Sequence, residues 1–206
     1  MGFRSVTISF GFVGMAALVL LFDRSGLLPF AVFAILTHEM GHIAVIYAMG
    51  GRVRRLHLGL VGFSIDYDGR RIGYPGEIGI ALAGSFANFV LAYGASVWGV
   101  FASSESLLLL AGVNMGAGLF NLLPVYQLDG GRAVNCLLAL VLDSEQAFHL
   151  VCVVSSVVVL GLLVLGVWLF IWSGWNFTLL LVAVWLLVGY CKNRGDAVKC
   201  ARRGRG

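Results

Sequence analysis

Long apolar segments dominate this chain of 206 residues and limit the folds open to it. Hydrophobic residues make up 60% of the sequence and charged residues 12%, whereas soluble domains carry about 25% charged residues. Six segments are close to the length of about 17–25 residues that a helix needs to cross a bilayer. They are Val6–Phe22, Leu27–Met49, Ile78–Phe101, Leu107–Leu123, Leu150–Ile171 and Trp175–Tyr190.

These segments predict an all-α membrane protein built as a six-transmembrane-helix bundle. No linker rich in proline, glycine or serine divides the sequence, so we expect one membrane domain, residues 1–191. A basic tail, residues 192–206, follows it. Arg4 precedes the first segment as in a signal peptide, but no small-residue cleavage site follows, and we expect that segment to be retained.

The distribution of positive charge predicts the orientation. With six spans, thirteen of the fourteen Lys and Arg residues fall on the side that holds both termini, and only Arg24 falls on the other. The positive-inside rule then predicts a multi-pass protein of the cell membrane with both termini in the cytoplasm. The basic tail is expected to lie on the anionic lipid bilayer. The net charge of +4 reflects this asymmetry and does not indicate nucleic-acid binding.

Three ionisable residues interrupt the second apolar segment, in the sequence LTHEMGHI. His38 and His42 are four residues apart, so a helix places both imidazoles on one face. Glu39 follows the first histidine directly. In this HExxH pattern two neutral imidazoles bind Zn²⁺ and the glutamate acts as general base. The alternative is a set of polar residues that joins helices by hydrogen bonds, but ionisable residues inside a membrane usually mark a functional site.

Asp129 is the candidate third ligand. It follows the fourth segment, in FNLLPVYQLDGGR. Pro124 is expected to end or kink the helix, so that a broken helix 4 results, and Gly130 and Gly131 predict a tight turn. Irregular backbone at membrane depth is tolerated only where it lines a cavity or is buried in protein. An Asp-Gly turn at the membrane surface is the alternative.

The depth of these residues in the bilayer is compatible with a shared site. At 1.5 Å per residue, His38 lies roughly 15 Å and His42 roughly 21 Å into the second span. The fourth span runs in the same direction, and Leu123 lies roughly 24 Å below Leu107. Asp129 can therefore lie level with His42 if the chain folds back slightly.

The segment between the second and third spans predicts a small membrane-associated β-hairpin at the cytoplasmic rim. Apolar residues alternate on either side of a turn that Gly59 and Gly62 bracket. An exposed strand edge could bind a substrate as an added strand, and an inert surface hairpin is the alternative. The alternating residues are Leu56, Leu58, Leu60, Phe63, Ile65 and Tyr67.

HEMGH and FNLLPVYQLDGGR together resemble motifs of the site-2 protease family of intramembrane zinc metalloproteases, and the resemblance covers roughly residues 27–142. The sequence GSFANF at 84–89 is similar to the glycine-to-asparagine motif of the same family. The resemblance implies a zinc endopeptidase that cuts a membrane-associated or transmembrane protein near the cytoplasmic side. The residues it implies are His38, His42 and Asp129 as zinc ligands, Glu39 as base, and Asn88 and Asn121 as residues that help to place the substrate backbone.

The compact form without an inserted PDZ domain is most similar to the sporulation branch, whose members process a sigma-factor precursor. Gln127 stands where many members have proline. Separate inhibitory membrane proteins are the expected regulatory partners. The competing functions are a metal-ion or proton transporter that uses the same His/Asp site, and a catalytically silent relative that binds membrane helices. A transporter would not require glutamate directly after the first histidine, and no internal repeat is visible in the sequence.

Overall fold

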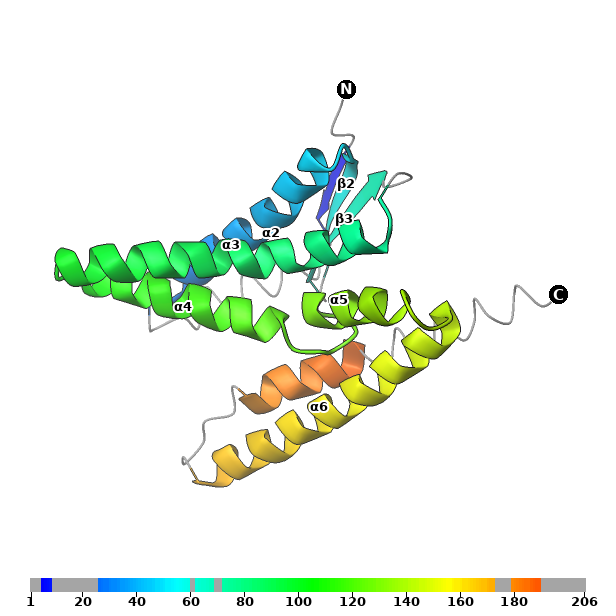
Figure 1. Cartoon of the computed structure of the whole chain (residues 1–206). Coiled ribbons are helices and arrows are strands. Elements are labelled where there is room, and N and C mark those ends of the chain that lie inside the picture. Colours follow the sequence, from blue (N-terminus) through cyan, green and yellow to red (C-terminus); the bar gives the residue numbers. More distant parts are fainter. Residues whose placement is uncertain (1–4, 9–25, 60–61, 69–71, 173–178, 190–206) are drawn as a thin grey trace. The chain divides into compact units, whose positions relative to one another are not determined.

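The computed structural model describes residues 5–8, 26–59, 62–68, 72–172 and 179–189. The chain divides into two units, Met1–Leu122 and Leu123–Gly206. Figure 1 shows the helices and the small sheet of the first unit, and the helices of the second. The elements are β1 Ser5–Ile8, α2 Leu28–Ala48, β2 Arg52–Gly59, β3 Gly62–Asp68, α3 Tyr74–Phe101, α4 Glu105–Asn121, α5 Asp129–Leu138 and α6 Ser144–Trp172, and a further short helix covers Leu179–Gly189.

Three of the described helices are long and apolar enough to cross a membrane: α2, α3 and α6. Many of their large apolar side chains are exposed, such as Phe101 on α3 and Ile171 on α6. Such surfaces are rare on soluble monomers and suit contact with lipid. Helix α4, with 17 residues, and the helix at Leu179–Gly189 are apolar but shorter. The predicted total of six spans therefore stays a prediction.

The prediction for the first apolar segment is wrong at its start. Ser5–Ile8 form a β-strand that pairs in parallel with β2, Ser5 opposite Arg55 and Ile8 opposite Leu58. Val6, Thr7 and Ile8 are β-branched, and a short apolar run of this kind fits a strand as well as a helix. Residues 9–25 of that segment lie outside the described residues, as do 173–178 between the fifth and sixth segments.

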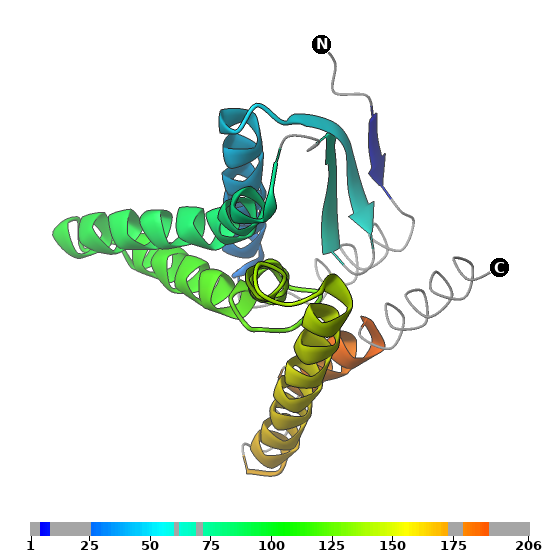
Figure 2. The same ribbon diagram turned by 45° about the vertical axis from the view of Figure 1, so that its right-hand side comes forward.

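The predicted β-hairpin is confirmed. Strands β2 and β3 are antiparallel, and Gly59 pairs with Gly62 at the predicted turn. The sheet has a third strand that the sequence did not predict, and its order is β1-β2-β3 (Figure 2). In the described part of the chain, β3 pairs with β2 alone and leaves its outer edge without a strand.

A short glycine motif carries the chain from α2 directly into the sheet. Gly50 has a positive φ of 76°, a conformation that glycine adopts without steric penalty. Its N–H donates to the carbonyl of Tyr47, and the N–H of Gly51 donates to that of Ile46, at 3.0 and 2.9 Å. This is the Schellman pattern that ends helices. The hairpin is therefore fixed to the last turn of α2.

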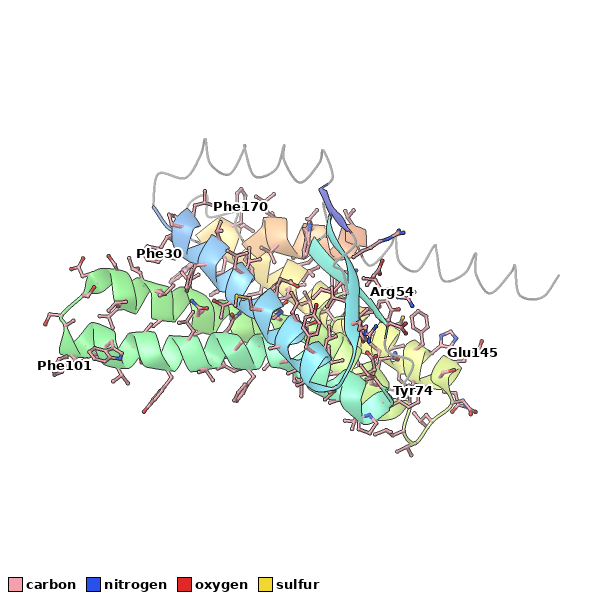
Figure 3. The ribbon with its side chains drawn as sticks, turned by 90° about the horizontal axis from the view of Figure 1, so that it is seen from above. Phe30, Arg54, Tyr74, Phe101, Glu145 and Phe170 are labelled. Atoms are coloured by element: carbon pink, nitrogen blue, oxygen red, sulfur yellow. The ribbon has the colours of Figure 1, made fainter. Side chains whose placement is uncertain are left out.

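Apolar packing holds the base of the hairpin against two helices. Ile46 of α2, Val53 of β2 and Ile80 of α3 form a buried cluster. The hydroxyl of Tyr67 on β3 also donates to the carboxylate of Glu77 in the first turn of α3. In Figure 3, Arg54 and Tyr74 lie at one end of this unit, and Phe30 and Phe101 lie toward the other. The base of the hairpin thus lies against the end of α2 and the start of α3, and its position at the membrane rim stays a prediction.

The second unit opens with the predicted interruption of the fourth helix. Helix α4 ends at Asn121, before Pro124, and α5 starts at Asp129. The intervening loop is braced by Ser155, which lies fully buried on α6. Its hydroxyl accepts a hydrogen bond from the Tyr126 N–H at 2.9 Å and donates to the Val151 carbonyl at 2.6 Å. A backbone polar group of the loop is thereby satisfied.

The tight turn predicted at Gly130 and Gly131 is not present. Both residues lie in the first turn of α5, behind Asp129. A Cβ at position 131 would lie 2.1 Å from the carbonyl oxygen of Val125 and 2.6 Å from the nitrogen of Tyr126. The glycine is needed because the loop backbone passes directly against the helix. Glycine is required at position 131 by the close approach of the loop backbone and not by a left-handed backbone conformation.

We expect Gly131→Ala to destabilise the protein, because the methyl group would overlap backbone atoms that cannot move aside. The free energy of unfolding should fall by about 1–3 kcal/mol, as for other overpacked sites. Gly161→Ala on α6 is the matched control, since nothing lies within 4 Å of a Cβ there. Thermal unfolding in detergent should show a lower Tm for the first variant alone. Equal Tm values would contradict the close approach of loop and helix.

Candidate metal centre

Helix α2 presents its two histidines on the only stripe of the helix that is buried. Ala34, His38, His42 and Ile46 are its buried residues, each four positions after the last. Both histidines are only 6% exposed. A helix advances about 100° per residue, so Glu39 lies beside this stripe, and it is half-buried.

The two imidazoles face one another through the same ring atom. Their Nε2 atoms are 3.1 Å apart, and the rings meet edge to face with centroids 4.7 Å apart. The Nδ1 of His42 lies 2.7 Å from the carbonyl oxygen of Ile80 on α3. A carbonyl can only accept, so this nitrogen carries the proton and the Nε2 of His42 carries a lone pair.

Glycine lets α3 approach the imidazoles. A Cβ at position 84 would lie 2.6 Å from the Nε2 atoms of both His38 and His42. On the facing helix, a Cβ at position 41 would lie 2.5 Å from the carbonyl oxygen of Ala83. Both contacts are closer than any side chain permits. Gly41 and Gly84 therefore allow the helix crossing that brings the backbone of α3 against the histidines.

This arrangement fits a zinc ion. Two zinc–nitrogen bonds of about 2.0–2.1 Å at a tetrahedral angle hold their nitrogens about 3.3 Å apart, close to the observed 3.1 Å. Ligating histidines usually donate their other N–H to a carbonyl or carboxylate, as His42 does to Ile80. The space that a Cβ at Gly84 would fill lies beside both ligand atoms. The paired histidines can thus supply two of the four ligands of a zinc site.

The remaining candidate residues are distributed over both units. Asp129 offers one carboxylate ligand atom for a metal ion and is half-buried in the first turn of α5. It belongs to the second unit, and its approach to the imidazoles stays a prediction. Asn121 is the last residue of α4 and donates to the Ala117 carbonyl at 3.1 Å. Asn88 is fully buried, with its Nδ2 3.3 Å from the Nδ1 of His38. Their predicted contacts with substrate stay predictions.

Sequence reasoning missed two features of this site. The carbonyl of Ile80 is a backbone group, and every residue has one, so the residue type does not indicate this contact. The function of Gly84 could have been found, because its spacing from Asn88 puts both residues on one face of α3. That face is the one that meets α2.

The fold has a solved counterpart. The chain is similar to the structure "Site-2 Protease from Methanocaldococcus jannaschii", with a TM-score of 0.69 over 91% of this chain and 89% of that one. The two chains share this fold. They are 21% identical in sequence. No protein-family model matches the chain, and no curated protein sequence does.

We expect Gly84→Ala to impair metal binding, because the added methyl group would occupy the space beside both ligand nitrogens. Zinc affinity should fall about tenfold or more, the range seen when groups that orient metal ligands are lost. Gly94→Ala is the control on the same helix, since nothing lies within 4 Å of a Cβ at that position. Zinc content and competition with a chromophoric chelator measure the difference. Unchanged affinity in the first variant would contradict the crowding.

Proposed function

We propose that this protein is an intramembrane zinc endopeptidase of the site-2 protease type. The observation that carries the proposal is the pair of buried imidazoles whose Nε2 atoms converge within 3.1 Å on an apolar helix. Glu39 follows the first of them and completes the HExxH pattern. The similarity of the fold to a site-2 protease gives further support.

Asp129 is the proposed third ligand. Two imidazoles, one carboxylate and an open position make a usual set for catalytic zinc. The first turn of α5 begins at Asp129, and the loop before it is held by Ser155 and by the close packing at Gly131. A ligand on such a braced helix start keeps its position better than one on a free loop. Arg132, one turn later, is a candidate to orient the carboxylate.

The chemistry follows from the residue types. When bound, zinc lowers the pKa of a coordinated water toward about 7 and polarises the scissile carbonyl. Glu39 takes up the proton of the attacking water and passes it to the leaving amine. Asn121 either donates a hydrogen bond to the substrate carbonyl or secures the end of α4.

A substrate helix must be unwound before its peptide bond can be attacked, because its own hydrogen bonds protect it. We propose that the outer edge of β3 binds the unwound segment as an added strand. Main-chain hydrogen bonds would then hold it extended, independent of its side chains. The hairpin is suited to this function because it is fixed to α2 and α3, the helices that carry and contact the histidines.

The proposed location of the enzyme in the membrane indicates the class of its substrate. We propose a membrane-associated or transmembrane protein cut near the cytoplasmic side, in a multi-pass enzyme of the cell membrane with both termini in the cytoplasm. A sporulation sigma-factor precursor is the specific substrate that the sequence resemblance implies. Separate inhibitory membrane proteins are the proposed regulators, and co-purification of the chain with such proteins tests that part.

Glu39→Gln tests the reaction. The amide cannot accept a proton, so cleavage of a tethered membrane substrate should fall at least about 100-fold, the lower range for loss of a general base. Bound zinc should stay at the level of the unchanged protein, because the ligands are intact. Glu105→Gln, at the exposed start of α4, is the control. Full cleavage by Glu39→Gln would exclude the protease, and zinc binding without cleavage by the unchanged protein would favour a transporter or a silent relative.

Asp129→Ala tests the third ligand. Loss of one of three protein ligands should greatly reduce the zinc content of the purified protein and abolish cleavage. Asp143→Ala, an exposed carboxylate of the same unit, should change neither. Metal analysis after gel filtration measures the outcome. A full zinc content in Asp129→Ala would show that another residue completes the site.

A further inference from the structure

Asn88 contacts the Nδ1 of His38, the ring nitrogen that does not face His42. Its side chain is fully buried on α3, and its carboxamide nitrogen lies 3.3 Å from the Nδ1 of His38. Its Oδ1 is buried and has no hydrogen-bond partner among the described residues. Buried polar atoms of this kind are rare and call for an explanation.

The proton positions in the histidine pair depend on this amide. His42 carries its proton on Nδ1, which donates to Ile80, so its Nε2 can only accept. If the amide nitrogen donates to His38 Nδ1, His38 is protonated on Nε2 and that proton points to His42 across the 3.1 Å gap. In this arrangement a proton, and not a lone pair, occupies the space between the ligand atoms.

Rotation of the Asn88 carboxamide by 180° moves the His38 proton from Nε2 to Nδ1. It exchanges the oxygen and nitrogen, whose positions are otherwise equivalent. The oxygen then accepts from His38 Nδ1–H, and His38 Nε2 directs its lone pair into the gap. The amide contacts His38 through one atom in either orientation, since its other polar atom has no hydrogen-bond partner among the described residues. No second hydrogen bond there opposes the rotation.

We propose that Asn88 is a positioning residue that holds His38 in its metal-binding tautomer. It does so by accepting the His38 Nδ1–H through Oδ1, as the Ile80 carbonyl does for His42. This inference rests on the proposed zinc function and gives Asn88 a role toward the metal ligand, in addition to the predicted one toward substrate. A carboxamide serves both tautomers of His38, whereas a carboxylate serves only the metal-binding one.

Zinc affinity of the purified full chain in detergent, measured by competition with a chromophoric chelator, tests this role. Asn88→Leu should bind zinc 10–100-fold more weakly, the range for loss of a group that orients a ligand histidine. The visible spectrum of the Co²⁺-loaded protein should change with it. Asn114→Leu is the matched control. Asn114 is equally buried, on α4; its Oδ1 has no hydrogen-bond partner in the described part of the chain, and its Nδ2 donates to the Leu110 carbonyl. The zinc affinity and the Co²⁺ spectrum of Asn114→Leu should equal those of the unchanged protein.

Asn88→Asp keeps the inference testable if Asn88→Leu does not fold. A carboxylate accepts from His38 Nδ1–H without rotation, so its zinc affinity should equal or exceed that of the unchanged protein. Weaker binding by Asn88→Asp would overturn the inference, as would unchanged binding by Asn88→Leu or an equal loss in Asn114→Leu. If the unchanged protein binds no zinc, the proposed function itself fails. If it binds zinc and every Asn88 variant binds equally well, only the role of Asn88 fails.

Discussion

The close crossing of α2 and α3 is the contact on which the rest of the first unit depends. Gly41 on one helix and Gly84 on the other remove the side chains that would separate the two backbones. In lipid there is no hydrophobic force between helices, so such contacts rely on close van der Waals packing and on hydrogen bonds. The bond from His42 to the Ile80 carbonyl supplies one of these. His42, a proposed zinc ligand, therefore also helps to hold the two helices together.

Two groups of buried polar side chains connect different segments of this apolar protein. His38, His42 and Asn88 form one connected set between α2 and α3. Ser155 forms another, in the second unit, where it supports the loop before Asp129. A buried polar group without a partner is strongly unfavourable in a low-dielectric interior. The hydrogen bonds within these two groups offset part of that cost.

Several helices, the hairpin and the shared face of the two histidines could be predicted, because each depends on residues close together in the sequence. The apolar runs placed α2 and α3 within a few residues, Pro124 marked the interruption before Asp129, and the alternation around Gly59 predicted the hairpin. The spacing of His38 and His42 fixed their shared face. Each of these follows from the period of a helix or strand, or from proline chemistry.

The features that were missed depend on contacts between distant residues. Strand β1 exists because β2, about fifty residues later, offers it an edge. Gly131 resembles a turn residue in sequence, but the loop backbone that crosses it makes it necessary. Ser155 is one serine among several until the fold brings it to Tyr126. A single sequence does not contain the information that pairs such residues.

The parallel pairing of β1 with β2 has a consequence for the order of assembly. Ser5 pairs with Arg55, so β1 has no strand partner until both α2 and β2 have been synthesised. Pairings with such large sequence separation form late, because the chain between them must first be ordered. The sheet thus matures after the helix that carries the histidines. Asp129, the proposed third ligand, starts α5 and follows all three strands in the chain, so the proposed metal site can be completed only in a chain that already contains the whole sheet.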